Sequence, residues 1–254
     1  MSSRLIKNLK IPISKLKSIA CNGTYLLLNY KFKHNEKKLL SLFYRKKVVI
    51  IGPGEQITNE LKLKILESDV CIIIKHLYSV INPNSELFSN TRLIISHTLR
   101  MPDRGYLKKS EIKNKNYSEV LFPFANDGFN CDLMRFSLSG NEDLNLYRAS
   151  SKDYLTIKKS IDGFMPSTAY ATIFLTQIYK PADLHIHGLT FYRNKGPFHI
   201  DGYRKAEISD NEILKHIKDT GNHSPENEFN SFLKLMSKKN ISTSGILREI
   251  IESL

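Results

Sequence analysis

An uninterrupted run of four aliphatic residues leads directly into a glycine turn near position 50. The run at 48–51 (VVII) follows three basic residues and ends at Gly52, Pro53 and Gly54. Such a run is typical of a strand that is buried on both faces of a parallel sheet. Parallel strands need a crossover, and residues 56–66 supply one, with apolar residues four apart on one helical face. This feature favours an α/β protein.

Strand and helix patterns continue to alternate along the chain. The alternation predicts a Rossmann-like fold, a parallel sheet flanked by helices. We expect one domain at 46–254, preceded by a basic N-terminal extension at 1–45. The order of the elements between 97 and 160 is left open. The predicted elements are strands at 26–28, 70–74, 92–96, 120–124 and 184–187, and helices at 37–44, 153–160, 169–179, 225–238 and 244–254.

Composition and charge exclude several classes of protein. A hydrophobic content of 41% with 12 glycines and 9 prolines is typical of a folded chain rather than a disordered or collagenous one. Cys21, Cys71 and Cys131 show no CxxC spacing, which favours a reducing compartment such as the cytoplasm. The basic N-terminus lacks an apolar core, and no stretch approaches the roughly 18 apolar residues of a membrane span. We therefore expect a cytoplasmic protein.

The net charge of +13 is compatible with several partners: nucleic acid, an anionic membrane surface or phosphate-bearing substrates. A nucleic-acid-binding α/β domain is one alternative. However, the Lys and Arg residues are scattered, and neither an aromatic RNA-binding motif nor a helix-turn-helix is recognisable. Peripheral contact with an anionic inner membrane is a second expectation. Assembly into a homo-oligomer stays open.

The glycine turn after the first strand does not match the common nucleotide-binding motifs. In a G-x-G-x-x-G dinucleotide motif the third glycine would fall on Ile57, and no Gly-Lys-Ser/Thr follows the turn. NAD binding and a P-loop are therefore disfavoured. His185 and His187 lie two apart on a predicted strand, but no carboxylate or cysteine stands at metal-ligand spacing, so no metal site is expected.

Four segments resemble the bacterial sialyltransferases of glycosyltransferase family 42, and more distantly those of family 29. The resemblance covers about residues 46–238 and is most specific in the second segment. It implies the GT-A-type variant of the Rossmann-like fold. The segments are 48–54, similar to the strand and turn that cradle the nucleotide; 165–192, similar to the sialyl motif of a hydroxyl-bearing helix start and a glycine-ended strand; 221–224, similar to the segment that carries the catalytic histidine; and 198–203, where the family's lid begins.

The resemblance implies an inverting, metal-independent transfer of sialic acid from CMP-sialic acid to a hydroxyl of a bacterial lipooligosaccharide, lipopolysaccharide or capsule. It assigns His223 as the general base, and Tyr192 as the donor of a phenol proton to the leaving phosphate. Ser167 and Thr168 would receive the donor's carboxylate or phosphate at a helix start. The other nucleotide contacts would fall on Gly52, Pro53, Gly54, Gly188, Leu189, Thr190 and Phe191.

Some positions depart from the family pattern around the donor sugar. Pro53 replaces an asparagine of the turn, and Lys75 with His76 stands where the family has an asparagine after the second strand. A cation at this place would pair with the donor's carboxylate or phosphate. These changes make another CMP-activated ulosonic acid, such as CMP-Kdo, an alternative donor.

Another departure falls in the predicted lid at about 193–222. The family's second phosphate-contacting tyrosine aligns with Phe198, and His199 or Tyr203 would replace its phenol. A further alternative is thus a relative that binds CMP-sugars without turning them over.

Overall fold

The computed structural model describes residues 30, 32, 34–101, 105–125, 127–139, 143–193 and 223–254. The predicted strand at 26–28 and the predicted lid beyond Arg193, with Phe198, His199 and Tyr203, lie outside these ranges. None of the helices in the described ranges combines the length and the apolar character that crossing a bilayer requires.

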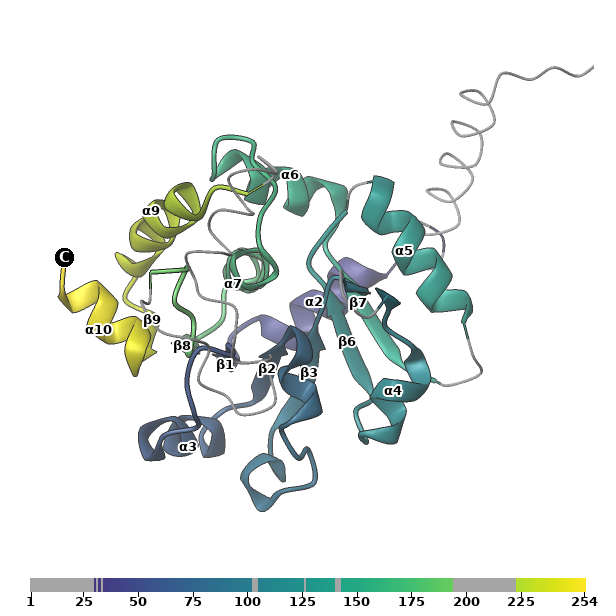
Figure 1. Ribbon diagram of the computed structural model, residues 1–254, viewed down its shortest axis with the longest axis horizontal. Helices are drawn as coiled ribbons and strands as arrows, with labels where there is room; N and C mark the ends of the chain where they lie inside the picture. Colours follow the sequence, from purple (N-terminus) through teal and green to yellow (C-terminus); the bar gives the residue numbers. More distant parts are fainter. Residues whose placement is uncertain are drawn as a thin grey trace, which may run out of the picture.

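Seven strands form one all-parallel sheet in the order β7-β6-β3-β2-β1-β8-β9 (Figure 1). From β1 the strands run outward to β7 on one side, and β8 and β9 extend the sheet on the other. The direction of winding therefore reverses between β1 and β8, as in Rossmann-like folds. The predicted α/β class is confirmed. The strands are β1 (Lys47–Ile51), β2 (Val70–Ile74), β3 (Arg92–Ser96), β6 (Glu119–Phe122), β7 (Asn145–Arg148), β8 (Asp183–His187) and β9 (Ile241–Ser244).

Helices cover both faces of the sheet (Figure 1). One face carries α2 (Asn35–Phe43), α6 (Ser151–Lys159), α7 (Thr168–Ile178) and α9 (Pro225–Met236). The other face carries α3 (Asn59–Leu66), α4 (Lys109–Asn114), α5 (Asp127–Leu138) and the 3-10 turns η1 (Lys75–Ser79) and η2 (Glu86–Phe88). The remaining elements are α10 (Ile246–Glu252) and the hairpin of β4 (Arg100–Met101) and β5 (Gly105–Tyr106).

The alternation of side chains along each strand builds two separate cores. Val48 and Ile50 of β1 belong to the core under α7, whereas Val49 and Ile51 belong to the core under α3. All four are buried, which explains the uninterrupted aliphatic run of the sequence. α2 packs against the same core as α7 through buried Leu39, Leu42 and Phe43.

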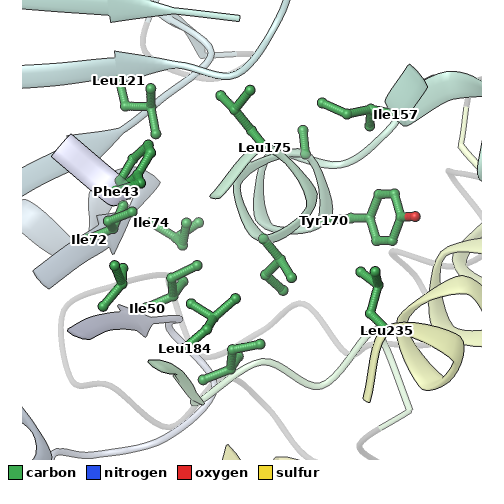
Figure 2. Packing of buried hydrophobic residues seen from close by; sticks show 14 of the residues in the cluster. Phe43, Ile50, Ile72, Ile74, Leu121, Ile157, Tyr170, Leu175, Leu184 and Leu235 are labelled. Atoms are coloured by element: carbon green, nitrogen blue, oxygen red, sulfur yellow. The ribbon is translucent and has the colours of Figure 1, made fainter. Parts of the chain in front are cut away.

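α7 is the central helix of its layer. Figure 2 shows Leu175 directed toward the sheet and Tyr170 directed away from it, with Leu235 of α9 beside the Tyr170 ring. A hydrogen bond of 2.6 Å joins the hydroxyls of Thr172 and Ser96, the last residue of β3. Because α7 leads into β8 at the amino edge of the sheet, its first residues lie at the carboxyl edge. This packing fixes where the N-terminus of α7 stands.

Two sequence-based expectations need correction. A helix was expected over 244–254, but residues 241–244 form β9 and the helix begins at Ile246. The helix expected at 56–66 begins at Asn59, because the Thr58 hydroxyl caps it by accepting from Leu61 N–H at 3.2 Å. Between 97 and 160, where the order was open, the chain supplies α4, β6, α5 and β7.

Candidate functional site

A cleft opens at the carboxyl edge of the sheet where the winding reverses between β1 and β8. Loops diverge at such a reversal, and open α/β sheets bind their ligands there. The cleft holds about 630 Å³ of empty space, part of it open to solvent. The structure thus brings together many of the predicted site residues, which come from four separate segments. The lining residues are Pro53, Ile74, Lys75, Ser167, Thr168, Ala169, Gly188, Leu189, Thr190, Phe191, Tyr192 and Glu228.

The predicted glycines hold the β1 and β8 loops against each other. A Cβ on Gly52 would overlap Leu189 and the carbonyl oxygen of Gly188, and one on Gly54 would lie 2.8 Å from the same oxygen. Gly54 N–H donates to Gly188 O at 2.7 Å, and Gly52 N–H donates to His187 O at 2.8 Å. These N–H groups are therefore used within the protein. Of the three turn residues, Pro53 lines the cleft.

Glu228 of α9 is a cleft residue that sequence reasoning missed. Its carboxylate accepts from the backbone N–H and the hydroxyl of Ser167, each at 2.6 Å. The Ser167 hydroxyl also caps α7 by accepting from Tyr170 N–H at 3.2 Å. The signal was present in the sequence, because Glu228 shares the buried face of α9 with Phe232 and Leu235. An acid on an apolar helix face is unusual and indicates a specific role.

Burial raises the pKa of the Glu228 carboxyl to about 7, although its hydrogen bonds to Ser167 and the charge of Lys75 act in the opposite direction. The side chain is 1% exposed, so the charged form loses nearly all of its hydration. A carboxyl group in this state exchanges a proton near neutral pH.

His223 lies just before α9 and is not among the residues that line the cleft, although the charge of the lining residue Lys75 acts on its ring. Its Nδ1 is 2.6 Å from the carbonyl oxygen of Met165, which can only accept, so Nδ1 carries the proton of the neutral ring. Burial lowers the pKa of His223, the hydrogen bond to Met165 acts in the opposite direction, and the positive charge of Lys75 lowers the pKa further. The neutral ring then has its lone pair on Nε2, as a general base requires.

Three residues of the cleft adopt the left-handed conformation that side chains disfavour. The φ angles are 52° at Lys75, 48° at Phe191 and 60° at Tyr192. Lys75 directly follows β2, and Phe191 and Tyr192 lie in the loop after β8. Such conformations cost of order 1–3 kcal/mol each and concentrate at functional sites. The strain at Lys75 arises where the chain leaves β2 for η1.

The predicted nucleotide contacts differ in what they offer a ligand. Phe191 stacks on Phe232 at 4.9 Å between ring centroids and also contacts Phe229, so its ring belongs to the core wall. Leu189 is similarly buried. Thr168 is 1% exposed, and its hydroxyl oxygen finds no hydrogen-bond partner within the described part of the chain. Thr168 therefore has an unused polar group at the cleft.

The rings of His185 and His187 are held by hydrogen bonds on both nitrogens. His185 contacts the hydroxyls of Ser242 and Ser244 at 3.0 and 2.8 Å. His187 contacts the Ser244 hydroxyl at 2.9 Å and the Gln56 carbonyl at 3.0 Å. These contacts join β8 to β9 and to the β1 loop, which is a structural role. Among the described residues, no three His, Cys, Asp or Glu side chains gather as a metal site would need.

Two predicted site residues, His199 and Tyr203, fall outside the described ranges, and the side chain of His76 is likewise not described. The described cleft therefore rests on the β1, β2 and β8 loops and on the starts of α7 and α9.

Comparisons with known proteins assign no family. No protein-family model matches the chain. A search of curated proteins also returned no significant match. The resemblance to sialyltransferases therefore stays a prediction that rests on the segments quoted above.

Proposed function

We propose that this chain is an inverting glycosyltransferase that moves a sialic acid from CMP-sialic acid to a hydroxyl of a bacterial surface glycan. The observation that carries the proposal is the state of His223. Its Nδ1–H donates to Met165 O at 2.6 Å, and its pKa is lowered, so the neutral ring has its lone pair on Nε2 and lies near Lys75 of the switch-point cleft.

In the proposed reaction, His223 Nε2 takes the proton of the acceptor hydroxyl as that oxygen attacks the anomeric carbon. The bond from the anomeric carbon to the phosphate oxygen breaks, and CMP leaves with its negative charge. A base that is neutral before the step and cationic after it also compensates the charge of the departing phosphate. The lowered pKa of His223 supports this role, because the ring is neutral at pH 7.

The anionic groups of the donor need positive charge and hydrogen-bond donors. Lys75 lines the cleft and offers an ammonium group to the donor's carboxylate or phosphate. Thr168 offers a hydroxyl whose oxygen is unpaired within the described residues, and Tyr192 offers a phenol. In this scheme Ser167 acts through Glu228, because its N–H and O–H groups already donate to that carboxylate.

Lys75 also supports a second donor. An ammonium group recognises the α-keto acid carboxylate that sialic acid and Kdo share, and does not distinguish the far ends of these sugars. CMP-Kdo is therefore proposed as the alternative donor. The acceptor would be a glycan of the lipooligosaccharide, lipopolysaccharide or capsule type.

The test is release of CMP from CMP-sialic acid and from CMP-Kdo in the presence of bacterial surface glycans. We expect His223→Ala to keep CMP affinity while reducing turnover about 100-fold or more, the usual scale for a general base. His34→Ala is the control, because His34 is exposed and lies outside the cleft. An unchanged rate in His223→Ala would remove His223 as the base, and no CMP release from either donor would overturn the proposed function.

A further inference from the structure

A second cavity lies beside β7, the outer strand of the sheet, next to α2 and the start of α4. It holds about 870 Å³ of empty space, part of it open to solvent, and its described lining shares no residue with the cleft. In Figure 1, α9 and α10 lie at the left, whereas β7 and α4 lie to the right of the centre of the sheet. This cavity is therefore a separate feature.

A buried cation forms part of its wall. Lys109 is 9% exposed, and its Nζ donates to the backbone carbonyl of Ser137 at 3.1 Å. Among the described residues, no carboxylate lies within ion-pair distance of Lys109. Buried lysines are rare in proteins unless a negative group compensates them. Ser137 lies in the last turn of α5, where the helix carbonyl groups carry a partial negative charge, and among the described residues the ammonium group of Lys109 meets no full negative charge, which suits an anion in the cavity.

The other charged residues that line the cavity also favour an anionic ligand. Lys38 of α2 and His34, just before α2, also line the cavity, whereas Asp143 is the one acid among the described lining residues. Behind the wall, the buried guanidinium group of Arg148 lies 5.3 Å from the centre of the Phe32 ring. Two lysines with a histidine suit a dianion better than a single carboxylate.

We propose that this cavity binds a small phosphorylated sugar. The phosphate group would lie between Lys109 and Lys38. The rings of Tyr30 and Phe32, which also line the cavity, would face the sugar, because aromatic rings offer flat apolar surfaces with polar groups at their edges. The proposal does not depend on the function assigned to the cleft.

The test is calorimetric titration of the full-length protein at low salt with inorganic phosphate, glucose 6-phosphate and glucose. We expect both phosphates to bind, glucose 6-phosphate more tightly, and glucose not to bind. Lys109→Met should weaken phosphate binding about tenfold or more, the scale of a lost hydrogen bond to a charged group. Lys115→Met is the matched control, because Lys115 is exposed and its Nζ also contacts a backbone carbonyl, that of Ser79 at 3.4 Å.

Two further variants keep the proposal falsifiable. Lys38→Met, on the exposed side of α2, should weaken binding even if Lys109→Met does not fold. If Lys75→Met abolishes phosphate binding while Lys109→Met does not, the phosphate occupies the cleft and the proposal is wrong. Absence of phosphate binding to the wild-type protein, or equal losses in Lys109→Met and Lys115→Met, would also overturn it.

Discussion

The carboxylate of Glu228 accepts two hydrogen bonds of 2.6 Å from Ser167, one from the backbone N–H and one from the hydroxyl. Ser167 is the N-cap of α7, and the N-terminus of a helix favours a negative group. That place is thus already occupied by an acid of the protein. A donor anion in the cleft would have to meet Lys75 and Thr168, beside this internal pair.

Replacing Ser167 with alanine should reduce both stability and donor binding. The change removes the cap of α7 and leaves the buried Glu228 with one donor fewer, so we expect a loss of about 1–3 kcal/mol in unfolding free energy. Ser150→Ala is the matched control, because Ser150 caps α6 in the same way, outside the cleft. It should lower stability yet keep CMP affinity. Equal CMP affinity in both variants would remove Ser167 from the site.

The pH dependence of stability should report the state of Glu228. Between the ordinary pKa of 4.5 and the raised value of about 7, this carboxyl is protonated in the folded protein and ionised in the unfolded chain. The stability due to this group is therefore present below pH 4.5 and lost as the pH rises through 7, by up to about 3 kcal/mol. Glu228→Gln cannot ionise, so this loss should be missing from its urea-unfolding profile.

The matched control for this profile is Glu226→Gln. Glu226 belongs to the same first turn of α9, but its side chain is 69% exposed and pairs with Arg193 at 2.7 Å. Its profile should parallel that of the wild type between pH 5 and 8. A Glu228→Gln profile that also parallels the wild type would show that the carboxyl is not protonated near neutral pH.

His185 should act on stability in the opposite direction. Burial lowers the pKa of His185 from 6.5 to about 4. Between these two pH values the ring is therefore protonated in the unfolded chain and neutral in the folded protein. Its contribution is complete above pH 6.5 and is lost as the pH falls through 4, by about 3 kcal/mol. His185→Asn should have a flatter acid profile than the wild type, measured by urea unfolding between pH 4 and 7. An equally steep profile would contradict the burial of a neutral ring.

The sequence was sufficient to predict the central sheet and the helices beside it. The strands at 48–51, 70–74 and 92–96 are aliphatic because both faces are buried, and that pattern is local. β9 escaped detection because Ser242 and Ser244 make it polar. Ser244 is buried and Ser242 is half-buried, and their hydroxyls contact His185 and His187, a pairing that is visible only once the strands are side by side.

The candidate site was likewise predicted in part. Lys75 and Tyr192 were predicted as site residues from the resemblance, and both follow strand ends, which meet at one edge of a parallel sheet. Glu228 was missed because its role depends on burial against Ser167, 61 positions away in the chain. The apolar face of α9 marks Glu228 as an unusual acid, but its partner Ser167 is set by the packing of α9 against α7, which local patterns do not encode.

The most direct test of the central claim is the thermal stability of the protein with CMP, CDP, UMP, GDP or NAD, each at saturating concentration. A ligand at 100 times its dissociation constant stabilises a protein by about 2.7 kcal/mol. We predict a clear upward shift of Tm with CMP that exceeds the shifts with GDP and NAD. No shift with CMP, or a larger shift with NAD or GDP, would contradict the assignment of the cleft to a CMP-activated donor.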